Sequence, residues 1–284
     1  MRKVNIITDC TSDLIPELIE KYEIRVLPLY INFGDKSYRD GIDLSTEELY
    51  KMVDQYKTLP KSAALPPQVF RDTFAEYPDD EDIIFMGIGK KFSGTYQNAI
   101  LASQDFTNVY VVDSANLSSG IGLLILKMCK FREEGLSAKE IVEKINVIAP
   151  KVRTQFSINT LTYLHMGGRC SGTSRIFGTM LKIKPIIKVV DGEMIVAKKP
   201  HGKYIKALDA LLDYIYDDKV NLDMDYVMVT HSLADEDAIY LKKELREHIP
   251  GINILETRAS GVISTHCGPR TIGISYIVDD ESVK

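Results

Sequence analysis

"DIIFMGIGKKFSGTYQNA", residues 82–99, passes from a continuous apolar run through a turn of small polar residues into a helical pattern. A short apolar run bounded by turn residues is typical of a buried β-strand. A strand followed by a turn and a helix is the repeating unit of a parallel sheet that helices cover on both faces. The stretch therefore predicts an α/β architecture. It also raises the question of what Ser93, Gly94 and Thr95 do at the turn.

The alternation of strands and helices extends through the first half of the chain. Apolar runs predict strands at "KVNIITD", "RVLPLYINF" and "NVYVVDS", and "FGDKSYRDG" has the composition of a hairpin. Ser45 and Glu48 form a capping-box pattern at the start of the helix "STEELYKMVDQY". The segment "KTLPKSAALPP" is expected to be a loop. We expect residues 1–155 to form an N-terminal three-layer α/β/α domain on a parallel sheet.

Beyond Pro150 the pattern changes. "KPIIKVVDGEMIVAKK" predicts a hairpin that turns at Asp191 and Gly192, and "TIGISYIV" predicts a terminal strand. We expect residues 156–284 to form a C-terminal α/β domain with a mixed or antiparallel sheet and helices on one face.

Composition limits the classes of function. The chain has 284 residues, of which 45% are hydrophobic and 26% charged, as in a soluble globular protein. The formal net charge of −5 gives no overall electrostatic footprint for nucleic acid. The most apolar helical stretch, "GIGLLILKMC", is interrupted by Lys127 and is too short to span a bilayer.

The N-terminus and the cysteines indicate a cytoplasmic protein. The chain reaches Asp9 before a signal-peptide core could form. Four cysteines are widely spaced with no C-x-x-C pattern, which favours free thiols over disulfides or a zinc site. No pair of histidines has metal-ligand spacing, so we expect no metal and no other cofactor.

Three predicted strands end in segments rich in hydroxyl groups: residues 8–13, 92–97 and 113–120. In an open parallel sheet, ligands bind beyond the carboxyl ends of the strands, where helix N-termini present free N–H groups. Ser, Thr and Asp are also favoured helix N-caps. The turns are therefore either caps or parts of a polar binding crevice.

Motifs for covalent or nucleotide chemistry are missing. Ser93 lies in "KKFSGT", which lacks the G-x-S-x-G elbow of α/β-hydrolases, and no Walker or dinucleotide-binding glycine pattern occurs. His266, in "STHCGPR", lies between small residues and a Gly-Pro turn. It is either a site imidazole or a loop histidine bonded to the backbone.

Several segments together resemble one known family. "ITDCTSDL", "FSGTYQNA", "VVDSANLSSGIGLL", "LTYLHMGGR" and "THCGPRTIG" occur in the order found in the DegV family of bacterial fatty-acid-binding proteins. The resemblance covers essentially the whole chain. Each motif alone is weak, but the ordered combination is specific.

The resemblance implies a function in lipid metabolism. Family members bury a long-chain fatty acid between two α/β domains and act as the lipid-carrying subunit of a two-component fatty acid kinase. They present the carboxylate to a separate kinase, which forms acyl-phosphate for phospholipid synthesis, and catalyse nothing themselves. By motif match, Ser93, Ser62 and His266 would bind the carboxylate, with Gly94 and Thr95 at the rim of the site.

The chain departs from the family pattern at two places near this predicted site. The family loop "TSQPS" reads "SAALP" in residues 62–66, which makes the rim more apolar. Arg270 replaces a small residue after Gly-Pro, which would put a guanidinium beside the mouth.

A docking surface for the kinase would need charges around the mouth. Arg169, Arg175, Lys203 and Lys206 are the candidates, and the alternative is that they are ordinary solvated cations. The resemblance also leaves room for transient contact with a membrane surface.

An enzyme is the alternative to a carrier. Ser93 activated by His266 would make the chain an acyl hydrolase or transferase. An intact bound fatty acid without ester turnover would distinguish the carrier from the enzyme.

Overall fold

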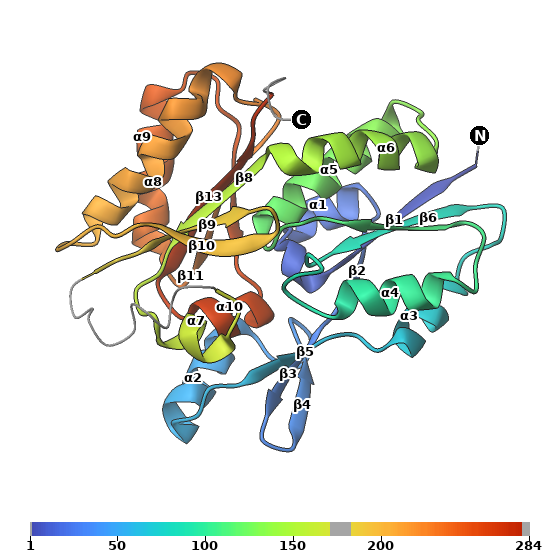
Figure 1. Ribbon diagram of the computed structural model, residues 1–284, viewed down its shortest axis with the longest axis horizontal. Helices are drawn as coiled ribbons and strands as arrows, with labels where there is room; N and C mark the ends of the chain where they lie inside the picture. The colour runs from blue at the N-terminus through green and yellow to red at the C-terminus, as the bar shows by residue number, and fades with distance from the viewer. Residues whose placement is uncertain (1, 171–182, 280–284) are drawn as a thin grey trace.

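A parallel four-stranded sheet in the order β2-β1-β6-β7 organises the first half of the chain (Figure 1). Its strands are β1 (Val4–Asp9), β2 (Arg25–Leu27), β6 (Asp82–Gly87) and β7 (Val109–Asp113). Every residue of β1 and β6 is buried, which is why β6 has a continuous apolar run, Ile83 to Met86, rather than an alternating pattern.

Helices cover this sheet on both faces. The helices α5 and α6 pack on the face opposite to α3 and α4 (Figure 1). Their bounds are α3 Pro67–Phe74, α4 Thr95–Ser103, α5 Ser119–Glu133 and α6 Ala138–Ile148, while the short α1 is Pro16–Lys21. The predicted three-layer α/β/α arrangement is confirmed.

A small antiparallel sheet, β4-β3-β5, projects from the first sheet together with the helix α2 (Thr46–Tyr56). Its strands are β3 (Tyr30–Phe33), β4 (Lys36–Arg39) and β5 (Lys61–Ala63). The run predicted as one strand, "RVLPLYINF", is divided into β2 and β3 at Pro28, because proline has no N–H for a sheet ladder. The prediction that "KTLPKSAALPP" is all loop was wrong in its middle, where β5 forms.

The second half of the chain forms a mixed six-stranded sheet in the order β10-β9-β8-β13-β11-β12. Only β11 and β12 run parallel, and the other neighbours are antiparallel, as predicted. Asp191 and Gly192 both have positive φ at the predicted hairpin turn. The strands are β8 Val152–Ser157, β9 Ile186–Val190, β10 Glu193–Lys198, β11 Val227–Ser232, β12 Ile254–Arg258 and β13 Thr271–Ile277.

The helix α5 lies between the two sheets and packs against both. It contacts β1 and β6 on one side and β8, β11 and β13 on the other, whereas α8 (Ile205–Asp218) and α9 (Asp235–His248) cover the outer face of the mixed sheet. Two short helices, α7 (Thr162–Gly167) and α10 (Gly261–Cys267), lie between the mixed sheet and the small sheet (Figure 1).

The structure is a computed structural model that describes residues 2–170 and 183–279. The predicted domain boundary at residue 155 lies within β8. Because α5 and α10 each contact both halves of the chain, the division into residues 1–155 and 156–284 stays a prediction.

The N-terminus of α10 is bound by two carboxylates from the first half of the chain. Asp13 accepts a hydrogen bond from Ser260 N at 2.8 Å, and Asp40 accepts from Gly261 N at 2.9 Å and from Val262 N at 2.8 Å. The free N–H groups of a helix N-terminus need such acceptors when they are buried. These bonds fix α10 against the N-terminal sheets.

Replacing Gly261 with alanine should test this contact. A Cβ at Gly261 would come within 2.6 Å of Asp40 Oδ1 and 2.7 Å of Ile31 Cδ1. We expect Gly261→Ala to lower the free energy of unfolding by about 1–3 kcal/mol, measured by urea denaturation. Gly94→Ala is the control, because a Cβ there meets open space, and its cost should stay below about 1 kcal/mol. Equal stability of the two variants would contradict the close approach.

Candidate functional site

Three predicted site residues, Ser62, Ser93 and His266, meet at one pocket. They come from β5, from the turn before α4, and from α10. The outer pocket, as we call this space of about 120 Å³, is also lined by Gly94 and Arg169. The structure thus brings together polar side chains from segments that are far apart in the sequence.

Ser62 and His266 are in direct contact. The distance from Ser62 Oγ to His266 Nε2 is 2.8 Å. Within the described residues, His266 Nδ1 is buried without a hydrogen-bond partner. It faces Gly167, where a Cβ would come within 2.4 Å of Nδ1. Glycine at this position therefore lets the end of α7 lie directly against the imidazole.

Ser93 is oriented by its neighbour Thr95. Ser93 Oγ lies 2.9 Å from Thr95 Oγ1 and accepts a hydrogen bond from Thr95 N at 3.2 Å. Thr95 is fully buried and bonds to Ser93, so the prediction that it forms part of the rim is wrong. Gly94 is the N-cap of α4 and makes no side-chain cap bond, which leaves the first turn of the helix open toward the pocket.

Arg169 is a site residue that sequence reasoning assigned only to a docking surface. The structure places it in the lining of the outer pocket. Gly168 ends α7 with φ 66°, and this left-handed turn leads the chain to Arg169. The "MGGR" pattern could have indicated this position of Arg169, because two glycines before a cation allow the backbone to approach a site closely.

Burial and charge keep His266 neutral. Burial, and secondly the positive charge of Arg169, lower the pKa of His266 to about 4. Among the described residues of the lining, Arg169 is therefore the cation at neutral pH, and His266 is a neutral hydrogen-bonding group. One guanidinium with hydroxyl and imidazole partners can hold a small anionic group such as a carboxylate.

The other predicted cations lie elsewhere. Arg270 donates from Nε to Asp237 Oδ2 at 2.9 Å, and its guanidinium lies 4.7 Å from the centre of the Tyr204 ring. It is absent from the lining of the outer pocket as far as the described residues show, so the prediction of a guanidinium beside the mouth is corrected. Lys203 and Lys206 are exposed near the start of α8. Arg175 lies outside the described residues.

A second space, the inner cavity, lies behind the outer pocket between α5, α10 and the mixed sheet. Leu117, Met194, Ile263 and His266 line both spaces, so the two are adjacent. The inner cavity has a volume of about 60 Å³. Its remaining lining includes Phe156, Leu164, Ala259 and Cys267, together with seven Ser and Thr residues: Ser118, Ser119, Thr154, Thr230, Ser232, Thr271 and Ser275.

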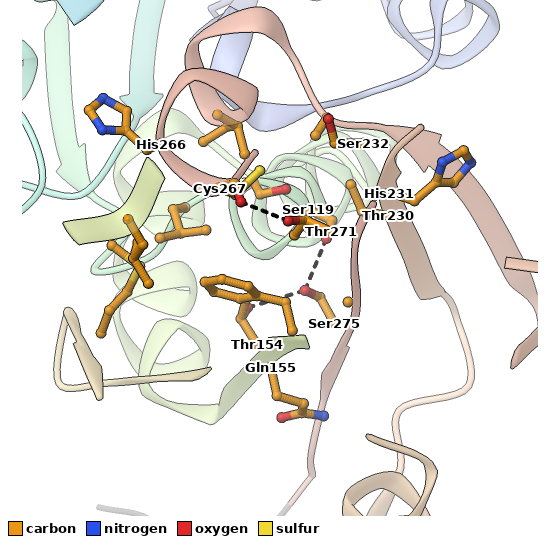
Figure 2. A pocket seen from close by; sticks show the side chains of 18 residues that line it. Ser119, Thr154, Gln155, Thr230, His231, Ser232, His266, Cys267, Thr271 and Ser275 are labelled. Carbon is orange, nitrogen blue, oxygen red and sulfur yellow. Dashed lines mark hydrogen bonds between the residues drawn. The ribbon is translucent and has the colours of Figure 1, made fainter. Parts of the chain in front are cut away.

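The hydroxyl groups of the inner cavity bond to the protein itself. Ser119 donates to Ser275 at 2.9 Å, and Ser275 donates to Thr154 at 3.2 Å (Figure 2). Thr154 in turn donates to Asn116 Oδ1 at 2.8 Å. Thr271 donates to the Cys267 carbonyl at 2.9 Å. Because these groups already have partners, they present mainly carbon to the cavity. The inner cavity therefore suits an apolar group.

His231 also lines the inner cavity, but its ring nitrogens contact Ala234 and Glu256. In Figure 2 its imidazole lies on the opposite side of the cavity from His266. Its Nδ1 accepts from Ala234 N at 3.1 Å, and its Nε2 lies 3.2 Å from Glu256 Oε1. Both ring nitrogens are therefore occupied, and the imidazole supports the end of β11.

The described residues contain no metal cluster and no membrane-crossing helix. Within residues 2–170 and 183–279, no three His, Cys, Asp or Glu residues gather as metal ligands. Over the same residues, none of the helices has the length and apolar composition that crossing a bilayer requires. Cys10, Cys129 and Cys267 are free thiols, as predicted.

Fold and site together define a class: α/β proteins with a parallel sheet and a mixed sheet, in which a pocket with polar side chains adjoins an apolar inner cavity. A family model described as "Uncharacterised protein, DegV family" matches residues 3–279. The chain belongs to the DegV family, as its sequence motifs predicted.

Individual relatives agree with this assignment. A DegV domain-containing protein of Clostridium acetobutylicum is 35% identical over 280 residues, which cover 98% of this chain and 99% of the relative. The structure titled fatty acid binding of a DegV family protein from Thermus thermophilus aligns with a TM-score of 0.91 at 28% identity, over 98% of this chain and 100% of that one. A stearic acid-binding protein from Eubacterium ventriosum aligns with a TM-score of 0.85 at 27% identity, over 99% and 100% of the two chains.

The environment of His266 can be tested by titration. We expect its imidazole to titrate with a pKa of about 4 in an NMR pH series. The folded-state pKa lies below the ordinary value of 6.5, so the contribution of His266 to stability is present above pH 6.5 and is lost as pH falls toward 4. Arg169→Gln should shift the titration upward, and Lys203→Gln should leave it unchanged. A midpoint near 6.5 in the wild type would show that the ring is solvated.

Proposed function

We propose that this protein binds a long-chain fatty acid, with its carboxylate in the outer pocket and its tail in the inner cavity. The observation that carries the proposal is that a pocket holding Arg169, two serine hydroxyls and an imidazole adjoins a cavity whose own hydroxyls are already bonded. An amphipathic acid matches both environments. Two structural relatives are described as binding a fatty acid, which supports the same ligand class.

The two ends of the ligand would contribute differently. Ser62, Ser93, His266 and Arg169 would bind the carboxylate through charge-assisted hydrogen bonds, each worth about 1.5–3 kcal/mol. The tail would gain about 0.8 kcal/mol for every CH₂ that it buries. A cavity of 60 Å³ has room for about two water molecules, so a long tail needs aliphatic side chains to rotate. Leu117, Met194 and Ile263, which line both spaces, are the side chains placed to do so.

The protein itself would perform no chemistry and would present the carboxylate to a separate fatty acid kinase. This part of the proposal rests on the family resemblance and on the position of the outer pocket at the end of the ligand that a kinase must reach. Because such a kinase uses ATP and supplies phospholipid synthesis, the proposal places the protein in the cytoplasm.

The enzyme alternative is favoured by one contact, Ser62 Oγ to His266 Nε2 at 2.8 Å. Ser93, the nucleophile expected from the sequence, instead bonds to Thr95. An activated serine also needs a basic imidazole oriented by a third group. The pKa of His266 is lowered to about 4, and its Nδ1 meets no carboxylate within the described residues. These observations make Ser62 a ligand-binding hydroxyl rather than a nucleophile.

The ligand can be identified directly. Protein purified from a bacterial host should release about one long-chain fatty acid per chain on extraction, measured by mass spectrometry. Ser93→Ala removes one carboxylate bond and should weaken binding roughly ten- to hundredfold. Ser37→Ala, at an exposed position on β4, is the control and should bind like the wild type. Trace acid in a folded wild type would contradict fatty acid binding, and turnover of an acyl ester that Ser62→Ala abolishes would favour the enzyme.

Docking to a kinase can be tested away from the ligand site. Arg169 lines the outer pocket, so it cannot report on docking alone, whereas Lys203 and Lys206 are exposed near the start of α8. Lys203→Glu with Lys206→Glu should slow acyl-phosphate formation by a kinase that accepts the wild type, and raised salt should slow the wild type as well. Bound fatty acid should stay constant. Lys243→Glu with Arg246→Glu, both exposed on α9, is the charge-matched control. Unchanged phosphorylation in the double variant would exclude this docking surface.

A further inference from the structure

Asp13 lies directly behind the inner cavity and binds both of its helical walls. Its carboxylate accepts a hydrogen bond from Ser118 Oγ at 2.5 Å and from Ser260 N at 2.8 Å. Ser118 immediately precedes α5, and Ser260 immediately precedes α10. One buried carboxylate therefore joins the starts of two helices that are more than a hundred residues apart in the sequence.

Both partners of Asp13 belong to segments that line the inner cavity. We call residues 117–119 and 259–263 the wall segments. All three residues of the first segment line the inner cavity, and Ala259 and Ile263 of the second do so as well. Leu117 and Ile263 also line the outer pocket. The distance between the wall segments therefore controls the width of the path that a tail would follow.

The backbone of Ser118 is strained. It has φ 54° and ψ −140°, a region that residues with a side chain rarely adopt. Such a conformation persists only where surrounding contacts hold it, and the hydroxyl bond to Asp13 is one of them. Asp13 itself has φ 52°, which aspartate and asparagine tolerate better than most residues.

The carboxylate is also costly at this position. Burial raises the pKa of Asp13 to about 7, against the opposite effect of the hydrogen bonds from Ser118 and Ser260. The two hydrogen bonds offset part of this cost, so the carboxylate and its two partners depend on one another.

We propose that Asp13 is a positioning residue that fixes the spacing of the two wall segments and so keeps the tail path narrow. This inference rests on the proposed function. With the backbone of both walls held, only side chains move to make room, and the tail stays in close contact along its length. A closely fitted path lets each added CH₂ contribute its full transfer free energy, which corresponds to about a fourfold gain in affinity per CH₂.

The test measures affinity against chain length. Dissociation constants for unbranched saturated acids of about ten to sixteen carbons, obtained by competition with a fluorescent fatty acid, give a slope that reports the tail and an intercept that reports the carboxylate. Asp13→Asn keeps the size and tolerates the backbone conformation but removes the charge. Ser118→Ala removes the hydroxyl that bonds to Asp13 and keeps the Cβ of this lining residue. In both variants we expect the slope to fall from about fourfold toward about twofold per CH₂, with the intercept retained.

Two comparisons separate this inference from simpler explanations. Asp225→Asn breaks another contact of α5 with the second half of the chain, to Lys127 and Lys130, away from the inner cavity. Asp225→Asn should lower the melting temperature without changing the slope. If Asp13 had only a structural role, Asp13→Asn would give the same result. Ser93→Ala should shift the intercept and leave the slope. If both Asp13→Asn and Ser118→Ala keep the wild-type slope, the positioning role of Asp13 is overturned but the proposed function is not. If the wild type binds no fatty acid, the proposed function is overturned as well.

Discussion

The site depends on one constraint: the buried N–H groups at the start of α10 need hydrogen-bond acceptors. These groups are buried between the two halves of the molecule, and the carboxylates of Asp13 and Asp40 accept their hydrogen bonds. The helix is only seven residues long, so fixing its start also fixes its end. His266 thereby reaches Ser62, and the chain beyond enters β13 in register with β8 and β11. Two acidic side chains of the first half thus position a functional group of the second.

The apolar character of the inner cavity comes from how its polar residues are paired. A lining with seven Ser and Thr residues would suit water if their hydroxyls were directed inward. In the chain from Ser119 to Asn116 each hydroxyl instead donates to the next acceptor, and Asn116 ends the chain with a carbonyl oxygen. The free energy of these bonds is already realised in the protein, so the cavity presents methyl and methylene groups. The polarity of the inner cavity is therefore set by the direction in which each hydroxyl points, and not by residue type alone.

Sequence patterns predicted the elements well where a local rule governed them, as at the capping box of α2 and the hairpin turn at Asp191. The meeting of Ser62, Ser93 and His266 was expected only through family resemblance, because nothing local links segments so far apart. One error came from a contact across the fold, because Arg270 binds Asp237. The other came from a local contact, because Thr95 is buried and bonds to Ser93. Arg169 was expected only at a docking surface, and residues 8–13 were expected either to cap a helix or to line a crevice; the tertiary structure places Arg169 in the outer pocket and Asp13 against Ser118 of the inner cavity.

The position of α5 has a consequence for folding. Ten of its fifteen residues are buried, because one side packs on the parallel sheet and the other on the mixed sheet. Neither sheet can therefore complete its core without a helix that the other also needs. Unfolding of one half would expose an apolar face of α5 and remove support from the remaining sheet. The chain should accordingly behave as a single cooperative unit, and a fragment cut near residue 155 would be deprived of part of its hydrophobic core rather than released as an independent domain.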